Sequence, residues 1–514
     1  MSTVTADSRA VDWRPTDKWL LGIVLAVITF WLFAQTLLNV IPGIQGNLGI
    51  PATIGNLAVS ITSLFSGIFI VVAGGLADRI GRVKILRLGI IFSIIGSLLI
   101  VLTPENAGIT SAMLLAGRII QGLSAACIMP SSMALLKAFY DGKERQRAVS
   151  MWSIGSWGGS GLCSLFGGFM ATTALGWRSI FWMSIIVAIA SLLLIAGTPE
   201  SKAESTGQKG FDWSGLITFI VALVAINVYI SQGPNIGWMS PVGLGLIAIA
   251  VISGLAFLQI ESHKGEAFMD LKLFSNGTFT GATLSNFLLN GAAGTLIVAL
   301  GLVQIAAGMS ALQSGLLTIG YLVAILATIR VGEKLLQRFG PKKPMLWGAM
   351  ITGAGVLLCS ATFLLTSQYI VLTVIGFTLF GVGLGFYATP STDAALSNVP
   401  EAQVGSASGI YKMASSLGNA IGVAISAALF AAGQAVNPEW IESWGIFLGR
   451  QDNIALRFGG ALGLLFNALM VVIAIASIIV TVPSEKQRAE AGEKTPEIDG
   501  RPVRQDVAPP PIGN

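Results

Sequence analysis

Long apolar runs alternate with short polar loops along almost the whole chain. Each run is long enough to cross a bilayer, since a helix of about 20 apolar residues spans roughly 30 Å of hydrocarbon. The pattern therefore predicts an all-α, polytopic membrane protein. Fourteen runs are expected to be transmembrane helices, at residues 19–41, 54–77, 86–103, 110–135, 148–170, 179–197, 214–232, 240–260, 279–305, 312–332, 344–365, 369–390, 404–431 and 457–482.

The composition agrees with a chain embedded in lipid. Of the 514 residues, 54% are hydrophobic and 11% are charged, whereas a soluble domain carries about 25% charged residues. The net charge of +5 is spread over many short loops, so no nucleic-acid-binding surface is expected. Cys127, Cys163 and Cys359 lie in apolar runs, and the one histidine, His263, lies in a polar loop. We therefore expect no metal site.

Basic residues divide the loops into two classes. The loops after the second, fourth, sixth, eighth and tenth runs each carry at least two Lys or Arg residues, whereas each alternate loop carries at most one, Arg178 or Arg450. By the positive-inside rule, we expect the basic loops and both ends of the chain to be cytoplasmic. The charged, proline-rich tail at 483–514 is expected to be disordered.

An internal repeat groups the runs. The sequence GGLADRIGRVK at 74–84 follows the second run, and GEKLLQRFGPKK at 332–343 follows the tenth, with Gly340 aligned on Gly81. Internal repeats around a central cavity are typical of secondary transporters. Two six-helix halves leave two helices inserted between them. The expected parts are a cytoplasmic tail (1–18), a six-helix bundle (19–198), a cytoplasmic linker (199–213), the inserted pair (214–260), a second cytoplasmic linker (261–278), a second six-helix bundle (279–482) and the C-terminal tail (483–514).

Two motifs resemble signatures of the major facilitator superfamily. The stretch GGLADRIGR at 74–82 resembles its loop 2–3 signature, and LLAGRIIQG at 114–122 resembles its fourth-helix motif. The expected number of helices, fourteen, resembles that of the drug:proton antiporter branch of this superfamily. Within that branch the chain closely resembles quinolone efflux proteins of the NorB and NorC type, through the stretches 28–35, 152–161, 285–291 and 387–393.

The resemblance implies a major facilitator fold and a proton-coupled multidrug exporter that works by alternating access. The implied substrates are amphiphilic drugs such as quinolones, dyes and quaternary ammonium compounds. The implied location is the bacterial plasma or inner membrane, with protons as the coupling ion and no other cofactor. The alternative is a transporter of one physiological metabolite that exports drugs incidentally. We expect a monomer in the lipid bilayer, although the sequence does not fix the oligomeric state.

Other functional classes find less support in the residues. An enzyme is not expected, because no paired nucleophile and base, histidine cluster or phosphate-binding loop occurs.

The chain also departs from the wider antiporter pattern. Phe33 stands nine residues before Pro42, the proline expected to end the first helix, where the branch usually has an aspartate. Cys163-Ser164 stands where the branch has Gly-Pro. By resemblance, NorB-type proteins share both departures.

The loop after the second run is a candidate conformational latch. Its residues are Gly74, Asp78, Arg79, Gly81 and Arg82. Small residues at 74 and 75 are expected to let one helix approach another closely, and Gly81 is expected to permit a sharp turn. Asp78 is expected to cap the next helix and to pair with Arg82. The alternative is a plain basic loop that only sets the topology. The second copy has Gln337 in place of the acid.

Arg118, Asp393 and Glu333 are candidates for proton coupling. An arginine at the centre of a membrane helix costs about 2.5–3.5 kcal/mol on insertion scales, so Arg118 must face protein or a wet cavity. The alternative is a structural arginine that binds backbone carbonyls. Asp393 is the preferred acid, just past the helix that the repeat pairs with the helix of Arg118. Asp393 and Glu333 lie near cytoplasmic helix ends, so either could instead be a solvated terminus.

Polar and aromatic side chains inside the runs are candidates for the substrate cavity. Residues at i, i+4 and i+8 share a helix face, and an amide and aromatic wall suits flat amphiphilic molecules. Amide bonding between helices is the alternative for each of them, and Lys412 could also extend to the cytoplasmic surface. The candidates are Trp31, Gln35, Asn39, Gln121, Asn286, Asn290, Tyr387, Tyr411 and Lys412.

Overall fold

The computed structural model describes residues 13–140, 144, 147–148, 151–152, 154–202, 212–263, 269, 271–396, 399 and 404–484. Within these ranges every regular element is a helix, as the sequence predicts. Eleven helical tracts in this part of the chain are long and apolar enough to cross a membrane, and α8 is apolar but only 17 residues long. The predicted disorder of 483–514 falls almost entirely outside the described residues.

The N-terminal half and the inserted pair come first along the chain. Caps define several helix starts: Thr16 accepts from the amide of Trp19 at the first helix, and Asp212 accepts from Gly215 at the first inserted helix. Such caps satisfy amides that a helix terminus leaves unpaired. The elements are α1 (Asp17–Ile28), η1 (Thr29–Ala34), α2 (Leu37–Leu48), α3 (Ala52–Ile80), α4 (Arg82–Val101), α5 (Thr110–Phe139), η2 (Ile154–Gly158), α7 (Gly159–Ala171), α8 (Arg178–Leu194), α9 (Trp213–Ile236) and α10 (Pro241–His263).

The C-terminal half follows the same plan. Asn276 caps its first long helix, and Ser310 with Gln313 forms a reciprocal capping box at the start of the short helix that begins at Ala311. The elements are η3 (Leu271–Ser275), α11 (Gly277–Gly291), α12 (Gly294–Ala307), α13 (Ala311–Leu316), α14 (Ile319–Phe339), α15 (Lys342–Cys359), α16 (Thr366–Leu396), α17 (Val404–Gln434), α18 (Pro438–Glu442) and α19 (Ile454–Thr481).

The predicted repeat corresponds to two matching helix turns. The helix α3 ends at Gly81, which has φ +133°, and α4 follows directly; α14 ends at Gly340, which has φ +65°, and α15 follows after Pro341. Positive φ favours glycine, because other residues suffer a clash at Cβ. The predicted sharp turn at Gly81 is confirmed, and Gly340 makes the equivalent turn in the second half.

Several runs that looked continuous in sequence are broken in the structure. The run 19–41 forms α1, a π-helical segment η1 and then α2, which contains Pro42 and continues to Leu48. The prediction that Pro42 ends this helix is therefore wrong. A proline is tolerated inside a membrane helix when other groups satisfy the freed backbone. The runs 148–170, 279–305 and 312–332 are also interrupted, by η2 or by a short turn.

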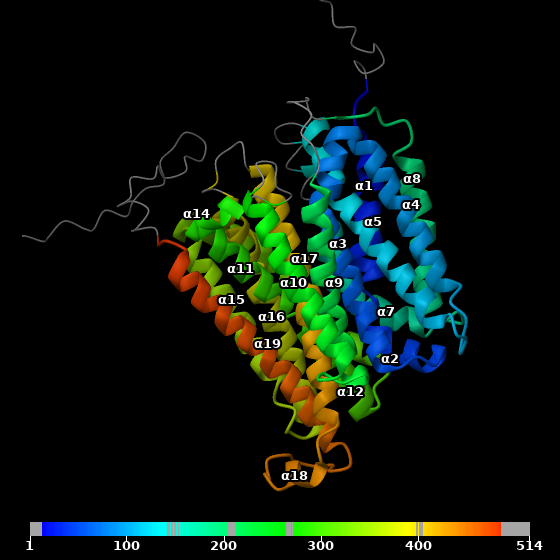
Figure 1. The fold of residues 1–514 in the computed structure, drawn as a ribbon, viewed down its shortest axis with the longest axis vertical. Coiled ribbons are helices and arrows are strands. Elements are labelled where there is room, and N and C mark those ends of the chain that lie inside the picture. Colours follow the sequence, from blue (N-terminus) through cyan, green and yellow to red (C-terminus); the bar gives the residue numbers. More distant parts are fainter. Residues whose placement is uncertain are drawn as a thin grey trace, which may run out of the picture.

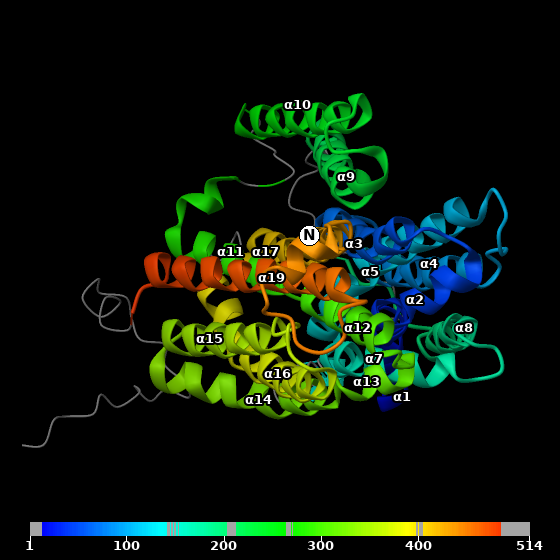
Figure 2. The ribbon, with the colours of Figure 1, turned by 90° about the horizontal axis from the view of Figure 1, so that it is seen from below.

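The two halves lie side by side, with the inserted pair outside them. In Figure 1 the N-terminal half and the C-terminal half form two groups of parallel helices, with α18 beyond one end of the bundle. Figure 2 shows α9 between α10 and the rest of the molecule, near α3 and α17. We call the end with α18 the α18 end, and the opposite end, where α3 reaches Arg79, the basic end.

Hydrogen bonds attach the inserted pair to the N-terminal half. The amide of Asn235 donates to the hydroxyl of Thr53 on α3, and Gln232 donates to the carbonyl of Thr53 at 3.3 Å. Further along, Ser60 of α3 donates to the side-chain oxygen of Asn227 at 3.4 Å. The helix α10 packs on α9 and exposes most of its remaining surface. The pair is thus held through α9.

Candidate functional site

The loop between α3 and α4 contains the predicted ion pair. The Arg82 Nε donates to Asp78 Oδ1 at 2.9 Å, and its Nη2 lies 2.8 Å from the same oxygen. Asp78 is half-exposed and Arg82 is mostly covered, while Arg79 is exposed. The pairing predicted for Asp78 and Arg82 is confirmed. Its role as a latch stays a prediction.

A carboxylate caps the start of α4, but the prediction that it belongs to Asp78 is wrong. Glu200, from the segment after α8, accepts from the amides of Val83 at 2.8 Å and Lys84 at 3.2 Å. A Cβ at Gly81 would lie 2.4 Å from the Glu200 carboxyl carbon, so glycine is required for this approach. A carboxylate suits the partial positive charge of a helix N-terminus. Glu200 thus takes the place predicted for Asp78, and the Asp78 carboxylate binds Arg82 instead.

The two preceding glycines do not mark a close helix contact. A Cβ at Gly74 would meet Pro130 of α5 at an ordinary 3.4 Å, and a Cβ at Gly75 would meet nothing within 4 Å. The expectation that both glycines allow close helix approach is therefore wrong. The tight contact of α3 with α5 lies deeper, where a Cβ at Gly122 would lie 2.5 Å from the Thr62 carbonyl oxygen.

Arg118 joins three helical segments of the N-terminal half. Its side chain is 1% exposed. Its Nε donates to the Ala58 carbonyl of α3 at 2.7 Å, and its Nη1 donates to the Ala34 carbonyl of η1 at 2.8 Å and to Gln121 Oε1 at 2.7 Å. The amide of Leu38, which would bond Ala34 in a regular helix, donates to Gln35 instead. Arg118 therefore satisfies a carbonyl that the break in the first run leaves free.

This arrangement matches the structural alternative for Arg118. Within the described residues its hydrogen-bond partners are two carbonyls and an amide, and none is a carboxylate. Gln121 completes the group by donating to Ser97 at 3.2 Å, so Gln121 is also committed to packing within its own half. The structure does not bring Arg118 together with Asp393, which lies on α16 in the other half.

The two candidate acids lie at the basic end of the C-terminal half. Asp393 is partly buried, three residues before α16 ends, and Glu333 is exposed near the end of α14. Glu333 follows Gly332, where a Cβ would lie 2.5 Å from the Gly385 carbonyl oxygen. The positions match the expected helix ends. Their roles in proton coupling stay predictions.

Asn39 forms a junction between the two halves near the α18 end. It is fully buried. Its Nδ2 donates to the carbonyls of Ser164 at 2.6 Å and Ala311 at 2.9 Å, and its Oδ1 accepts from Gln304 at 2.9 Å and Ser314 at 3.0 Å. With every side-chain donor and acceptor used, the alternative of amide bonding between helices describes Asn39 better than a substrate-facing role. We call these five residues the lock.

Close backbone packing supports the lock. The helix α7 of the N-terminal half approaches α13 of the C-terminal half so closely that a Cβ at Gly168 would lie 2.3 Å from the Ala311 carbonyl oxygen. A Cβ at Gly315 would likewise lie 2.7 Å from the Ser164 carbonyl oxygen. These glycines allow the two halves to meet at the α18 end.

A second polar bridge crosses between the halves at mid-depth. Gln35 donates to Ser63 of α3 at 3.5 Å, and Ser63 donates to Asn419 Oδ1 of α17 at 3.0 Å. Lys412 lies seven residues before Asn419, and therefore on the same face of α17. Its side chain is exposed, whereas the flanking Tyr411 and Met413 are buried. The structure thus groups Gln35 and Lys412 on the surfaces where the halves face each other.

Trp31 carries an unused donor near this bridge. Its indole nitrogen is buried and has no hydrogen-bond partner within the described part of the chain. The residue packs edge-on against Phe30, with ring centroids 5.1 Å apart, and a Cβ at Gly159 would lie only 3.1 Å from the Trp31 Cβ. Buried polar groups are normally paired. Trp31 therefore remains the candidate whose geometry fits a ligand contact best.

The remaining candidates form a polar cluster inside the C-terminal half. Asn290 donates to Asn286, and Asn286 donates to the Tyr411 carbonyl at 3.0 Å. The Tyr411 hydroxyl donates to Ser391 at 2.8 Å, and Ser391 donates to the Tyr387 hydroxyl at 2.8 Å. Tyr387 and Tyr411 are nearly fully buried. The structure joins these four candidates, but by bonds that tie α11, α16 and α17 to one another.

Several of these residues were missed by the sequence analysis. Ser63, Gln304 and Ser391 are ordinary polar residues in apolar runs, and only their partners show their roles. The π-helical segments η1 and η2 fall inside stretches 28–35 and 152–161, which carried the family resemblance. Such segments often occur at functional sites. No group of three or more potential metal ligands occurs in the described residues.

Comparisons with known proteins agree on one family. The model of the Major Facilitator Superfamily matches residues 21–279 and 279–505. The Quinolone resistance protein NorB of Staphylococcus aureus strain MRSA252 is 49% identical over 469 residues, covering 91% of this chain and 96% of that protein; NorB of strain COL gives the same values.

Solved structures share the fold. A D-xylose-proton symporter aligns with a TM-score of 0.63 at 15% identity, covering 91% of this chain and 98% of that one. The POT family transporter PepTSo aligns with a TM-score of 0.60 at 14% identity, covering 90% and 97%. The matched family model, the NorB relatives and the two-lobed helical fold lead to one conclusion: the chain is a multi-pass membrane protein that belongs to the major facilitator superfamily.

Proposed function

We propose that the protein is a proton-coupled multidrug exporter of the bacterial cell membrane, and that quinolones are among its substrates. The observation that carries the proposal is the lock, in which Gln304 and Ser314 of one half hold Asn39 of the other near the α18 end. Alternating access requires contacts between halves that exist at one end in one state. The quinolone resistance named for the NorB relatives suggests the substrate class.

The topology that fits this function has fourteen transmembrane helices in a six-two-six arrangement. Eleven tracts qualify by length and composition, and η2 with α7, α8 and α15 supply the remaining three. The basic loops support a cytoplasmic basic end, both termini in the cytoplasm and an extracellular α18 end. The domain boundaries given above follow from this arrangement, with α9 and α10 as the inserted pair.

The conformation that these contacts favour is open toward the cytoplasm. The lock closes the extracellular end, and the bridge of Gln35, Ser63 and Asn419 closes the middle. Drug would enter from the basic end and contact surfaces that include Trp31, Gln35 and Lys412. The pair of Asp78 and Arg82 would act as the latch that changes partners when the cytoplasmic end closes.

Proton coupling needs an acid whose affinity for a proton differs between the two states. Asp393 is our preferred carrier, because it lies on the same helix as Tyr387 and Ser391 and so moves with the polar cluster of the C-terminal half. Arg118 would then act by holding the broken first run rather than by contacting the acid. Glu333 is the second candidate.

The proposal is tested by drug accumulation in bacterial cells. Cells that produce the protein should accumulate less of a fluorescent quinolone than cells that produce an Asp393→Asn variant at the same membrane level. A protonophore should raise accumulation in the first cells to the level of the second. Equal accumulation in all cases would contradict the proposal.

A further inference from the structure

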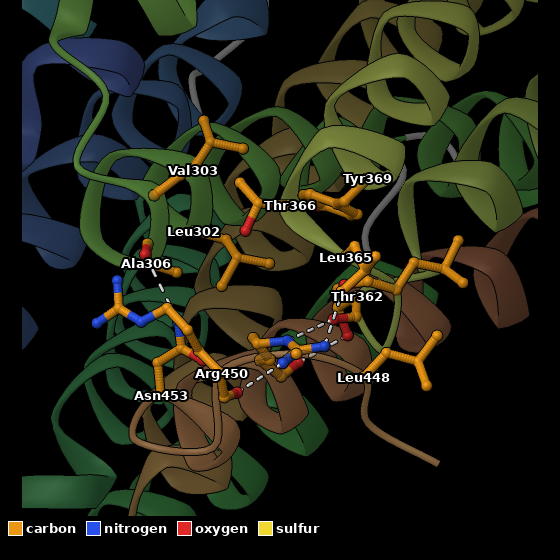
Figure 3. A pocket seen from close by; sticks show the side chains of 14 residues that line it. Leu302, Val303, Ala306, Thr362, Leu365, Thr366, Tyr369, Leu448, Arg450 and Asn453 are labelled. Carbon is orange, nitrogen blue, oxygen red and sulfur yellow. Dashed lines mark hydrogen bonds between the residues drawn. The ribbon is translucent and has the colours of Figure 1, made fainter.

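A cavity lies inside the C-terminal half at the α18 end, apart from the surfaces where the halves meet. Its volume is about 190 Å³, and its walls come from α12, from the start of α16 and from the loop between α18 and α19 (Figure 3). None of the predicted substrate-cavity residues lines it. It is therefore a separate place in the molecule and not part of the site described above.

The loop that closes this cavity is held in place by a defined set of bonds. The Leu448 amide donates to the Phe363 carbonyl at 2.8 Å. Arg457, which is 7% exposed, donates from Nε to the Thr362 carbonyl at 2.8 Å and from Nη2 to the Leu364 carbonyl at 3.1 Å. These bonds fix the wall of the cavity. They also leave a guanidinium charge at its edge, and the described hydrogen-bond partners of this charge are carbonyls.

Two polar atoms in the wall have no hydrogen-bond partner among the residues that the structure describes. They are the hydroxyl of Tyr369, a residue that is 5% exposed, and the side-chain oxygen of Asn453. The Thr373 hydroxyl, one turn after Tyr369, donates to the Tyr369 carbonyl at 2.8 Å. The Asn453 amide nitrogen donates weakly to Ala306 at 3.5 Å. Buried unpaired groups are rare in native proteins and call for a partner.

The rest of the lining sets the size and character of that partner. Leu302, Val303 and Leu365 contribute an apolar surface, and Figure 3 shows Tyr369 and Asn453 on opposite sides of it. Pockets for drug-sized ligands hold about 300–1,000 Å³, whereas a dry cavity of about 150 Å³ can hold benzene. The space suits a molecule with a single ring. The charge of Arg457 disfavours a cation.

We propose that this cavity binds a neutral, single-ring amphiphile with a hydrogen-bond acceptor at one end and a donor at the other. The acceptor receives the Tyr369 hydroxyl proton, and the donor binds Asn453 Oδ1. The ring packs against Leu302 and Val303 of α12. This site differs in place, in size and in preferred charge from the path proposed for exported drugs.

The test compares two probes of the same shape on the purified full-length protein in lipid nanodiscs. Para-aminoacetophenone has a carbonyl acceptor and an amine donor, whereas para-cymene has the same outline with neither. We expect the wild-type protein to bind para-aminoacetophenone roughly ten-fold more tightly, because each net hydrogen bond adds a modest amount. Tyr369→Phe should weaken that probe about three-fold and leave para-cymene unchanged.

Two further variants make the result decisive. Tyr321→Phe removes another nearly buried phenol of the same half, outside the cavity, and should leave both affinities unchanged. Ala306→Leu narrows the cavity itself and should weaken both probes. Equal affinities of the two probes for the wild-type protein would show that water serves the two polar atoms, and would overturn the proposal. Undiminished binding of both probes to Ala306→Leu would overturn it as well, whatever the transport activity of the protein.

Discussion

Gln304 in the C-terminal half donates to both the backbone carbonyl and the side-chain oxygen of Asn39 in the N-terminal half, each at 2.9 Å. One side chain thus holds two separate acceptors across the boundary between the halves. Hydrogen bonds between membrane helices contribute about 0.6 kcal/mol each on average. The lock is therefore strong enough to favour one state and weak enough to open during a transport cycle.

Removing this bond should shift the protein toward the outward-open state. Gln304→Leu loses two inter-half bonds, which corresponds to about 1–2 kcal/mol, or roughly a 5- to 30-fold change in the ratio of states. Distances between spin labels across the α18 end should lengthen in most of the population. Gln434→Leu is the control, because the described partner of the Gln434 amide is the carbonyl of Phe430 in its own helix. An unchanged distance distribution in Gln304→Leu would show that these bonds do not set the state.

Arg118 should prove to be a positioning residue. Arg118→Lys leaves the carbonyls of Ala34 and Ala58 without the planar fork that reaches both, and an unpaired buried group costs about 1–3 kcal/mol. Thermal stability and efflux should therefore fall together, while the pH dependence of the remaining efflux should stay that of the wild type. The exposed Arg450→Lys serves as the control. Full stability with a shifted pH profile would instead assign Arg118 a direct part in coupling.

The latch is tested by comparing two ion pairs at the surface, one at each end of the molecule. Asp78→Asn removes the partner of Arg82, and Asp452→Asn removes the partner of Arg450. Exposed pairs contribute about 0–1 kcal/mol to stability, so both variants should fold and insert normally. Only Asp78→Asn should slow efflux, by about ten-fold if a state-dependent contact is worth roughly 1.4 kcal/mol. Wild-type efflux at wild-type membrane levels would reduce this loop to a determinant of topology.

Trp31 should tolerate the loss of its indole nitrogen. Because that N–H has no partner among the described residues, Trp31→Phe should cost little stability. If drugs use the N–H, the variant should raise the drug concentration for half-maximal efflux about three- to ten-fold. Trp19→Phe is the opposite case, since Trp19 donates to Thr198 at 2.9 Å; it should lower thermal stability and leave that concentration unchanged. An unaltered drug dependence in Trp31→Phe would remove Trp31 from the substrate path.

The sidedness can be checked by labelling single cysteines from outside the cell. The native cysteines Cys127, Cys163 and Cys359 are buried and can be replaced. Cysteines at Gly46 and Met239, which are exposed at the α18 end, should react with an impermeant thiol reagent, whereas one at Lys334 should not. Reaction at all three positions would contradict the proposed topology.

The sequence predicted those features that depend on hydrophobicity and charge. Run lengths predicted the helices, and the glycines at 81 and 340 predicted the repeated turns, because these signals are local. The partners of buried polar residues could not be predicted, since Asn39 and Gln304 are 265 positions apart and nothing in either run points to the other.

The interruptions of the α-helix inside the apolar runs could not be predicted from the sequence either. The segment η1 contains neither glycine nor proline, and the carbonyl of Ala34 accepts a hydrogen bond from Arg118, which lies 84 positions away. Likewise, Glu200 replaced Asp78 as the cap of α4 because two segments more than 100 positions apart meet there. A single sequence does not show that the carboxylate of a distant residue will cap a helix in place of the carboxylate of a nearby one.

The most direct test of the central claim is proton release driven by drug. The purified protein would be reconstituted into liposomes that contain a pH-sensitive dye, with an imposed pH gradient. Addition of a quinolone should dissipate the gradient faster in liposomes with the wild-type protein than in those with Asp393→Asn, because export of drug exchanges for protons. Drug movement without any change in proton flux, or the same flux in both kinds of liposome, would contradict an antiporter coupled through Asp393.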